Sequence, residues 1–62
     1  MKILNVADQA ASLELDRNEL ITINNALNEI LNGIDLEAEF ETRVGTSREK
    51  ARALLKAISS LA

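Results

Sequence analysis

The residues of this chain most suited to chemistry are four acids at alternate positions, Asp35, Glu37, Glu39 and Glu41. A calcium loop needs a defined spacing of oxygen ligands and a central glycine, and this run has neither. Paired catalytic carboxylates need a pocket that moves their pKa values apart, and 62 residues leave little room to build one around a substrate. We therefore interpret the run as a solvated acidic face, with a docking surface for a basic partner as the alternative.

Nucleophilic and metal chemistry are restricted by composition, because the chain has neither cysteine nor histidine. Ser–His and Cys–His pairs, disulfides and ordinary zinc or haem sites are thereby excluded. There is also no glycine-rich phosphate loop. We expect no enzymatic activity, no catalytic residue, no metal, no cofactor and no small-molecule ligand.

Asparagines recur every four residues at Asn24, Asn28 and Asn32, and Asn25 adjoins the first of them. Asparagine is a mediocre helix former because its side chain competes for backbone hydrogen bonds. A merely solvated helix face would be better served by Glu, Lys or Gln. The row is either a tolerated polar face bonded to neighbouring groups or an uncharged contact surface for a partner chain.

Cations form a second row at four-residue intervals, Arg48, Arg52 and Lys56, with Arg43 and Lys50 close in sequence. Such a row can be a solvated or intramolecularly paired face, a docking face for an acidic protein, or a nucleic-acid contact. Reversing the charge of Arg48 and Arg52 is expected to leave the fold intact and to abolish partner capture. The candidate partner surface combines both rows: Asn24, Asn25, Asn28, Asn32, Arg43, Arg48, Arg52 and Lys56.

The segment 40–51 resembles the turn of helix-turn-helix modules, whose second helix enters the DNA major groove. It departs from that pattern at Glu41, because the position four before the turn glycine is usually small. Glu37 and Glu39 on the same first helix would also repel a phosphate backbone. DNA binding is therefore possible but disfavoured.

Charge is unevenly distributed along the chain, whose net charge is −3. Residues 1–41 carry nine acids and two bases, whereas residues 42–62 carry five bases and one acid. This asymmetry can mark a partner surface, or acidic and basic faces that meet within one fold. No segment has the ~18–20 consecutive apolar residues that span a bilayer, so we expect no membrane partner and a cytoplasmic location.

Apolar periodicity predicts a mainly α-helical fold, with α+β as the alternative, in a single compact domain of residues 1–62. Helices are expected at about 17–32, 36–44 and 48–60. Asp16 and Glu19 form a capping-box pattern before the first, and Gly33 is expected to end it in the left-handed conformation. Residues 36–44 also alternate as a strand would, but Glu and Ala favour the helix.

The first sixteen residues are expected to form a short β-hairpin, with a helical turn as the alternative. Phe40 should be the bulkiest residue of one small core, which is expected to collect the apolar faces of the three helices. The core residues expected from the helical spacing are Leu20, Ile23, Leu27, Ile30, Leu31, Ile34, Leu36, Phe40, Val44, Ala51, Leu54, Leu55, Ile58 and Leu61.

The segments LITINNALNEILNG (20–33) and EFETRVGTSREKA (39–51) resemble a family of short bacterial proteins. The shared pattern is an Asn-Asn-Ala-Leu-Asn-Glu helix, then Phe-x-Thr-Arg-x-Gly, then Ser-Arg-Glu. The resemblance covers about two-thirds of the chain and implies no activity, cofactor or partner. It does imply a set of positions to test first: Asn24, Asn25, Asn28, Phe40, Arg43 and Gly45.

These observations favour a small non-enzymatic protein-interaction module of the adaptor, inhibitor, antitoxin or immunity type. A homodimer is expected, because a chain this short has little core and no disulfide or metal to stabilise it. One alternative is a small helix-turn-helix regulator. Another is an acidic nucleic-acid mimic that blocks a DNA- or RNA-binding protein.

Overall fold

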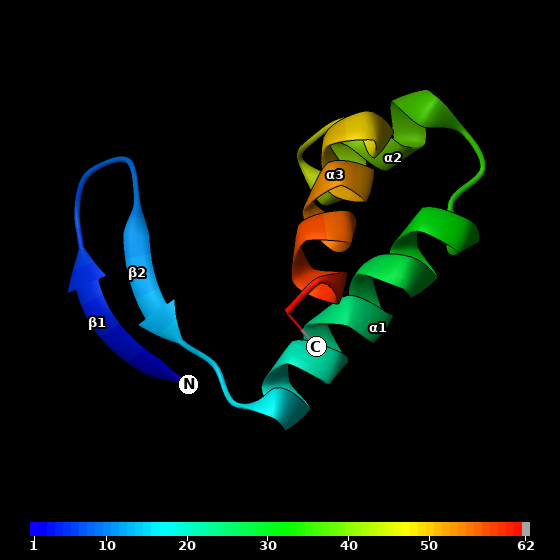
Figure 1. Cartoon of the computed structure of the whole chain (residues 1–62). Helices are drawn as coiled ribbons and strands as arrows, with labels where there is room; N and C mark the ends of the chain where they lie inside the picture. Colours follow the sequence, from blue (N-terminus) through cyan, green and yellow to red (C-terminus); the bar gives the residue numbers. More distant parts are fainter. Residues whose placement is uncertain (62) are drawn as a thin grey trace.

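The computed structural model describes residues 1–61, in which a β-hairpin precedes three helices (Figure 1). The hairpin pairs β1 (Lys2–Val6) with β2 (Ala11–Glu14) in antiparallel fashion. The helices are α1 (Arg17–Gly33), α2 (Glu37–Val44) and α3 (Arg48–Ser59). The expected mainly α fold with a short N-terminal hairpin is confirmed, and the segment that also alternated like a strand is helical.

The helix starts follow the local capping signals. The Asp16 carboxylate accepts a hydrogen bond from the Glu19 amide while Glu19 accepts one from the Asp16 amide, so the expected capping box is formed. Ser47 caps α3 by accepting from the amide of Lys50. Gly45 ends α2 with φ of +86°, in the left-handed region that glycine adopts without steric penalty.

The prediction for Gly33 is wrong. Gly33 is the last helical residue of α1, and Ile34 follows with an extended backbone at φ −119° and ψ 111°. Among residues 1–61, only Gly45 has a positive φ. A left-handed residue is not needed after α1 because a side chain from α3 binds one carbonyl of its last turn and the carbonyl of the residue that follows the helix.

That side chain is Arg48, whose guanidinium reaches back 17 and 14 residues to the carbonyl oxygens of Leu31 and Ile34. Its Nε also donates to Glu37 at the start of α2, at 2.6 Å. The guanidinium carbon lies 4.6 Å from the centroid of the Phe40 ring, in cation–π geometry. One cation, 16% exposed, therefore links the end of α1, the start of α2 and the start of α3.

The core is small and centres on Phe40, which is fully buried as its bulkiest member. Leu31 of α1 and Ala51 of α3 complete the buried cluster. Other apolar residues are packed around it and partly buried: Ile30, Ile34, Val44 and Leu55. The expected core members Leu20, Ile23, Leu27 and Ile58 are also half-buried along the α1–α3 contact.

Three expected core residues are exposed, and the prediction is wrong for them. Leu36, Leu54 and Leu61 are 67%, 52% and 66% exposed. Leu36 is the extended residue before α2, outside the helical stripe that it seemed to share with Phe40. Leu54 lies to one side of the Ala51–Leu55 stripe that contacts α1, and Leu61 follows the last turn of α3.

The hairpin stands apart from the helices, and all nine strand residues are exposed (Figure 1). Helix α3 packs on both α1 and α2, but within residues 1–61 neither strand packs against a helix. The molecule accordingly measures 36 × 27 × 15 Å, with an open space between the hairpin and α3. Among the described residues, no helix is long and apolar enough to cross a membrane.

Replacing Arg48 with alanine should lower the free energy of unfolding by about 2–4 kcal/mol. The change removes charge-assisted hydrogen bonds and a cation–π contact from a site with little water. Arg48→Lys should recover only part of this loss, because an ammonium group lacks the planar fork that binds two carbonyls and a carboxylate. Urea unfolding followed by circular dichroism measures the effect.

The matched control is Arg52→Ala, one helical turn later on the exposed surface of α3. It should change the free energy of unfolding by less than about 0.5 kcal/mol. Equal losses for Arg48→Ala and Arg52→Ala would contradict the structural role of Arg48.

Candidate functional site

The two long helices, α1 and α3, run antiparallel and together form the main surface of the molecule (Figure 1). A hydrogen bond marks one side of this pair, because the Ser59 hydroxyl donates to the Asn24 amide oxygen at 2.5 Å. These residues are 35 positions apart in sequence, so the bond determines which edge of α1 adjoins which edge of α3.

The asparagine and basic rows meet on this side. Asn28 follows Asn24 by one helical turn, and Lys56 and Arg52 precede Ser59 by one and two turns. All of them therefore lie on the edge where α1 and α3 adjoin. We call this surface the polar flank: Asn24, Asn28, Arg52, Lys56 and Ser59. The sequence contained both rows but not their juxtaposition, and it gave no sign that Ser59 belongs with them.

The individual side chains of the polar flank differ in their freedom. Asn24 is half-buried and bonded to Ser59, whereas Asn25 and Asn28 are exposed. Asn32 donates to the backbone and side-chain oxygens of Asn28 at 2.9 and 3.2 Å. Both interpretations of the asparagine row thus find support, since part of it bonds within the fold and part faces solvent.

Two of the predicted basic residues are engaged inside the chain. Arg48 is committed to the helix ends and Glu37, so it is removed from the candidate partner surface. The expectation that reversing its charge leaves the fold intact is corrected accordingly. Arg43 pairs with Glu39 at 3.2 Å on the surface of α2. Arg52 and Lys56 are exposed and form no ion pair with residues 1–61.

The acidic run does not converge into a site. Glu37 and Glu39 each pair with an arginine, Arg48 and Arg43 respectively. Within residues 1–61, no three acidic side chains are grouped closely enough to hold a metal ion. Part of the charge asymmetry is therefore neutralised within the fold, between the acids of α2 and the bases around it.

The opposite side of the α1–α3 pair faces the hairpin. On α1, Glu19 and Ile23 lie across the buried stripe from Asn24; on α3, Leu54 lies across it from Arg52. Leu61 lies seven residues, or about two turns, after Leu54. Because the backbone of Ser60 is still helical, Leu61 stays on the same side as Leu54. We call this surface the hairpin flank: Glu19, Ile23, Leu54 and Leu61.

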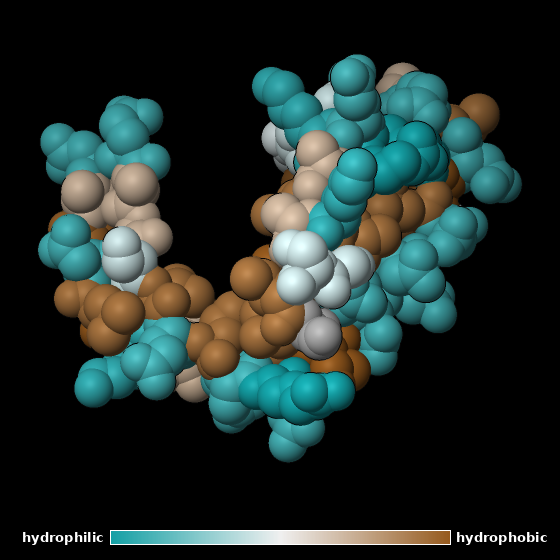
Figure 2. Space-filling model, in the orientation of Figure 1, coloured by the Kyte–Doolittle hydropathy of each residue, from teal (hydrophilic) through white to brown (hydrophobic). Residues whose placement is uncertain are grey.

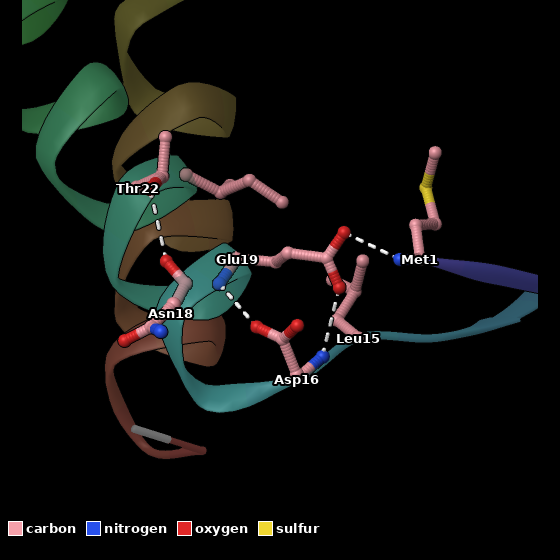
Figure 3. A pocket seen from close by; sticks show the side chains of 7 residues that line it. Met1, Leu15, Asp16, Asn18, Glu19 and Thr22 are labelled. Atoms are coloured by element: carbon pink, nitrogen blue, oxygen red, sulfur yellow. Dashed lines mark hydrogen bonds and ion pairs between the residues drawn. The ribbon is translucent and has the colours of Figure 1, made fainter.

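Glu19 joins the hairpin to α1 (Figure 3). One of its carboxylate oxygens accepts from the Asp16 amide at 3.0 Å, and the other accepts from the Met1 amino group at 2.5 Å. The hydrogen bond to Glu19 raises the pKa of the Met1 amine above its ordinary 8.0. The same bond, then that from the Asp16 amide, lowers the pKa of Glu19 below 4.5.

Beside this contact lies an open pocket of about 330 Å³. Its walls come from the hairpin end and the first turns of α1: Met1, Leu15, Asp16, Asn18, Glu19, Thr22 and Ile23. Glu19 is ionised and fully engaged there, which is the opposite of the raised pKa that a general acid needs at neutral pH. The pocket is therefore better suited to binding an apolar side chain than to catalysis.

An apolar surface extends beyond this pocket. In Figure 2, hydrophobic atoms run from the hairpin across the base of the molecule to the helices. Large apolar residues are exposed on both parts of the molecule, namely Ile3, Val6 and Leu13 on the hairpin and Leu54 on α3. The sequence did carry signals for these residues, namely the strand alternation and the seven-residue spacing of Leu54 and Leu61. The leucines, however, were assigned to the core, and the hairpin residues were assigned to no site.

Comparison of the chain with protein families, with curated proteins and with solved structures finds no match in any of the three. The resemblance to short bacterial proteins stays a prediction. Of the positions that it implies, Phe40 and Gly45 have structural roles, in the core and at the end of α2. Asn25 and Asn28 are the exposed asparagines among them.

The Met1–Glu19 contact gives the hairpin attachment a pH dependence with two limits. Because the pKa of Glu19 is lowered, the stabilisation is complete above pH 4.5 and is lost as the pH falls further. Because the pKa of the Met1 amine is raised, the stabilisation is complete below pH 8.0 and is lost as the pH rises further. Amide hydrogen exchange of β1 and β2, corrected for its intrinsic pH dependence, should show weaker protection outside this window.

Glu19→Gln is the control for this titration, since it retains a hydrogen-bonding side chain without the charge. In this variant the changes in protection at low pH and at high pH should both disappear, because the ion pair is absent at every pH. Equal hairpin protection at low, neutral and high pH in the unsubstituted chain would contradict the prediction.

Proposed function

We propose that this chain is a non-enzymatic protein-interaction module that acts as a homodimer and binds an acidic protein partner through its polar flank. It would act as an adaptor, inhibitor, antitoxin or immunity-type protein. The observation that carries the proposal is the Ser59–Asn24 hydrogen bond, which aligns the asparagine row beside Arg52 and Lys56.

The chemistry of the polar flank favours a carboxylate-bearing partner. Arg52 offers a planar fork of donors that matches a carboxylate, and Lys56 adds a second positive charge one turn away. Neutral asparagine amides beside them can donate to and accept from a partner backbone. Rim charges of this kind steer association and determine which partner fits.

The helix-turn-helix alternative is weakened by the role of Arg48. In such modules the first residues of the second helix contact base edges. Here the first residue of α3 turns inward and binds the carbonyls of α1. The nucleic-acid mimic is weakened in turn by the pairing of Glu37 and Glu39 with arginines of the same chain.

Reversing both cations of the polar flank, Arg52→Glu with Lys56→Glu, should abolish partner capture by the immobilised chain from a lysate of its source cells. The fold should persist, because both side chains are exposed. Mass spectrometry identifies the captured protein, and circular dichroism verifies the helices. A captured protein that is acidic and binds directly when purified supports the proposal.

The matched control is Lys2→Glu with Arg43→Glu, which changes the net charge equally but lies on the hairpin and on the surface of α2, away from the polar flank. This control should retain capture. Equal capture by the two double variants, or no capture by the unsubstituted chain, would overturn the proposal. Salt-sensitive retention of duplex DNA by the unsubstituted chain would instead favour the regulator.

A further inference from the structure

The hairpin has one apolar and one polar face, and its register establishes this. Ile3 pairs with Leu13 and Val6 pairs with Ala11, whereas Asn5 pairs with Ser12 and Lys2 with Glu14. Paired residues share a face, and neighbours along β2 alternate between faces. The apolar face therefore carries two apolar pairs, and the opposite face carries the polar and charged pairs.

A β-bulge makes this sorting possible. Ile3 and Val6 are three residues apart, which in a regular strand would put them on opposite faces. The register shifts between Ile3 and Asn5, where β1 has one residue more than β2. The bulge brings Val6 back to the face of Ile3, so that the paired residues of the hairpin sort into one apolar and one polar face.

Nothing in residues 1–61 covers this apolar face. Ile3 is 64% exposed and Val6 70% exposed, and neither strand packs against a helix. An isolated two-stranded hairpin is marginally stable in water, and it needs a further strand or an apolar surface against its face. Leu54 on α3 and Leu61 just after this helix form a strip that is similarly exposed.

The chain's own hairpin is held away from this strip. Only Leu15 and Asp16 separate β2 from α1, and Asp16 belongs to the capping box. Glu19 also holds the start of β1, at the same end of the hairpin, through the Met1 amine. Folding the hairpin onto α3 of the same chain would disrupt these bonds, so an occupant from outside the chain fits better.

The exposed area indicates the size of that occupant. The chain exposes 4974 Å², whereas a compact monomer of this mass exposes about 4000 Å². The excess of about 1000 Å² is close to the ~800 Å² that each partner contributes to a stable protein–protein interface. One more protein surface of ordinary size would therefore cover what this chain leaves open.

From these observations we propose that the occupant is a second copy of this chain, in a two-fold dimer where each hairpin covers the Leu54–Leu61 strip of the other copy. A strand of five residues spans about 16 Å, and the strip spans about 10 Å along α3. The hairpin is therefore long enough to cover the whole strip.

The arrangement rests on the homodimer of the proposed function and specifies its interface. Because the contact is reciprocal, one dimer buries both hairpins and both α3 strips and leaves no open end. The polar flank lies on the other side of the α1–α3 pair, so it stays accessible for a different partner in the dimer.

The first experiment measures the mass of the full chain in solution, by sedimentation equilibrium over a range of concentrations, with Val6→Lys and Asn5→Lys as a matched pair. The unsubstituted chain and Asn5→Lys should reach twice the monomer mass of 6.8 kDa. Val6→Lys should shift to the monomer mass, because it places a charge on the apolar face. A monomeric unsubstituted chain, or a Val6→Lys variant that dimerises as well as Asn5→Lys, would overturn the proposal.

A second experiment identifies the surfaces in contact and does not depend on the stability of a charged variant. The chain has no cysteine, so Leu13→Cys and Leu54→Cys introduce single thiols into separate preparations. After mixing and mild oxidation, disulfides between the two variants should dominate. Dominant Leu13→Cys homodisulfides would mean that hairpins pair with each other, which would overturn the reciprocal arrangement.

The two proposals fail separately. Arg52→Glu with Lys56→Glu should keep the dimer mass, since these residues lie on the polar flank. If the unsubstituted chain dimerises but captures no partner, the dimer interface is supported and the proposal of an acidic partner fails. If the chain is monomeric but captures its acidic partner through the polar flank, the dimer proposal fails and the proposed partner stands.

Discussion

The guanidinium of Arg48 is the interaction on which the helical part of this protein depends. The chain has no disulfide and a buried core of three residues, so the helices need a further connection. Arg48 supplies it by binding the carbonyl end of α1, the first acid of α2 and the face of Phe40 at once. A cation at the C-terminal end of a helix also complements the helix dipole. The position of α3 follows from this contact.

Much of the fold was predictable because its signals are local. The Asp16–Glu19 capping box, the apolar spacing of α1 and α3 and the turn at Gly45 act within a few residues. The role of Arg48 was not predictable in this way, because its partners lie 11 to 17 residues away. A four-residue interval looks the same whether a side chain faces water or a helix end. The error at Gly33 has the same origin, since the carbonyls that a left-handed glycine would help to satisfy are bound by Arg48.

The candidate surfaces show a similar limit. Each row of polar residues was visible from its spacing, but helical periodicity gives the angle of a residue around its own helix and not the neighbour that it faces. The Asn24–Ser59 bond supplies that missing relation. Leu54 was assigned to the core because it is apolar and adjoins Leu55. Leu54 is exposed because the contact between α1 and α3 is narrow. The width of that contact depends on how the two helices pack and on no single residue.

The Met1 amine has a consequence for how this protein is handled. Any residue added before Met1, or acetylation of its amine, converts a charged group into a neutral amide and removes the ion pair with Glu19. The capping box would survive, because Glu19 and Asp16 bond through their own side chains and backbone. A purification tag at the amino end would thus leave a well-formed helix attached to a hairpin that lacks this ion pair. Assays of association made on such a fusion would report on a different molecule from the one with a free Met1.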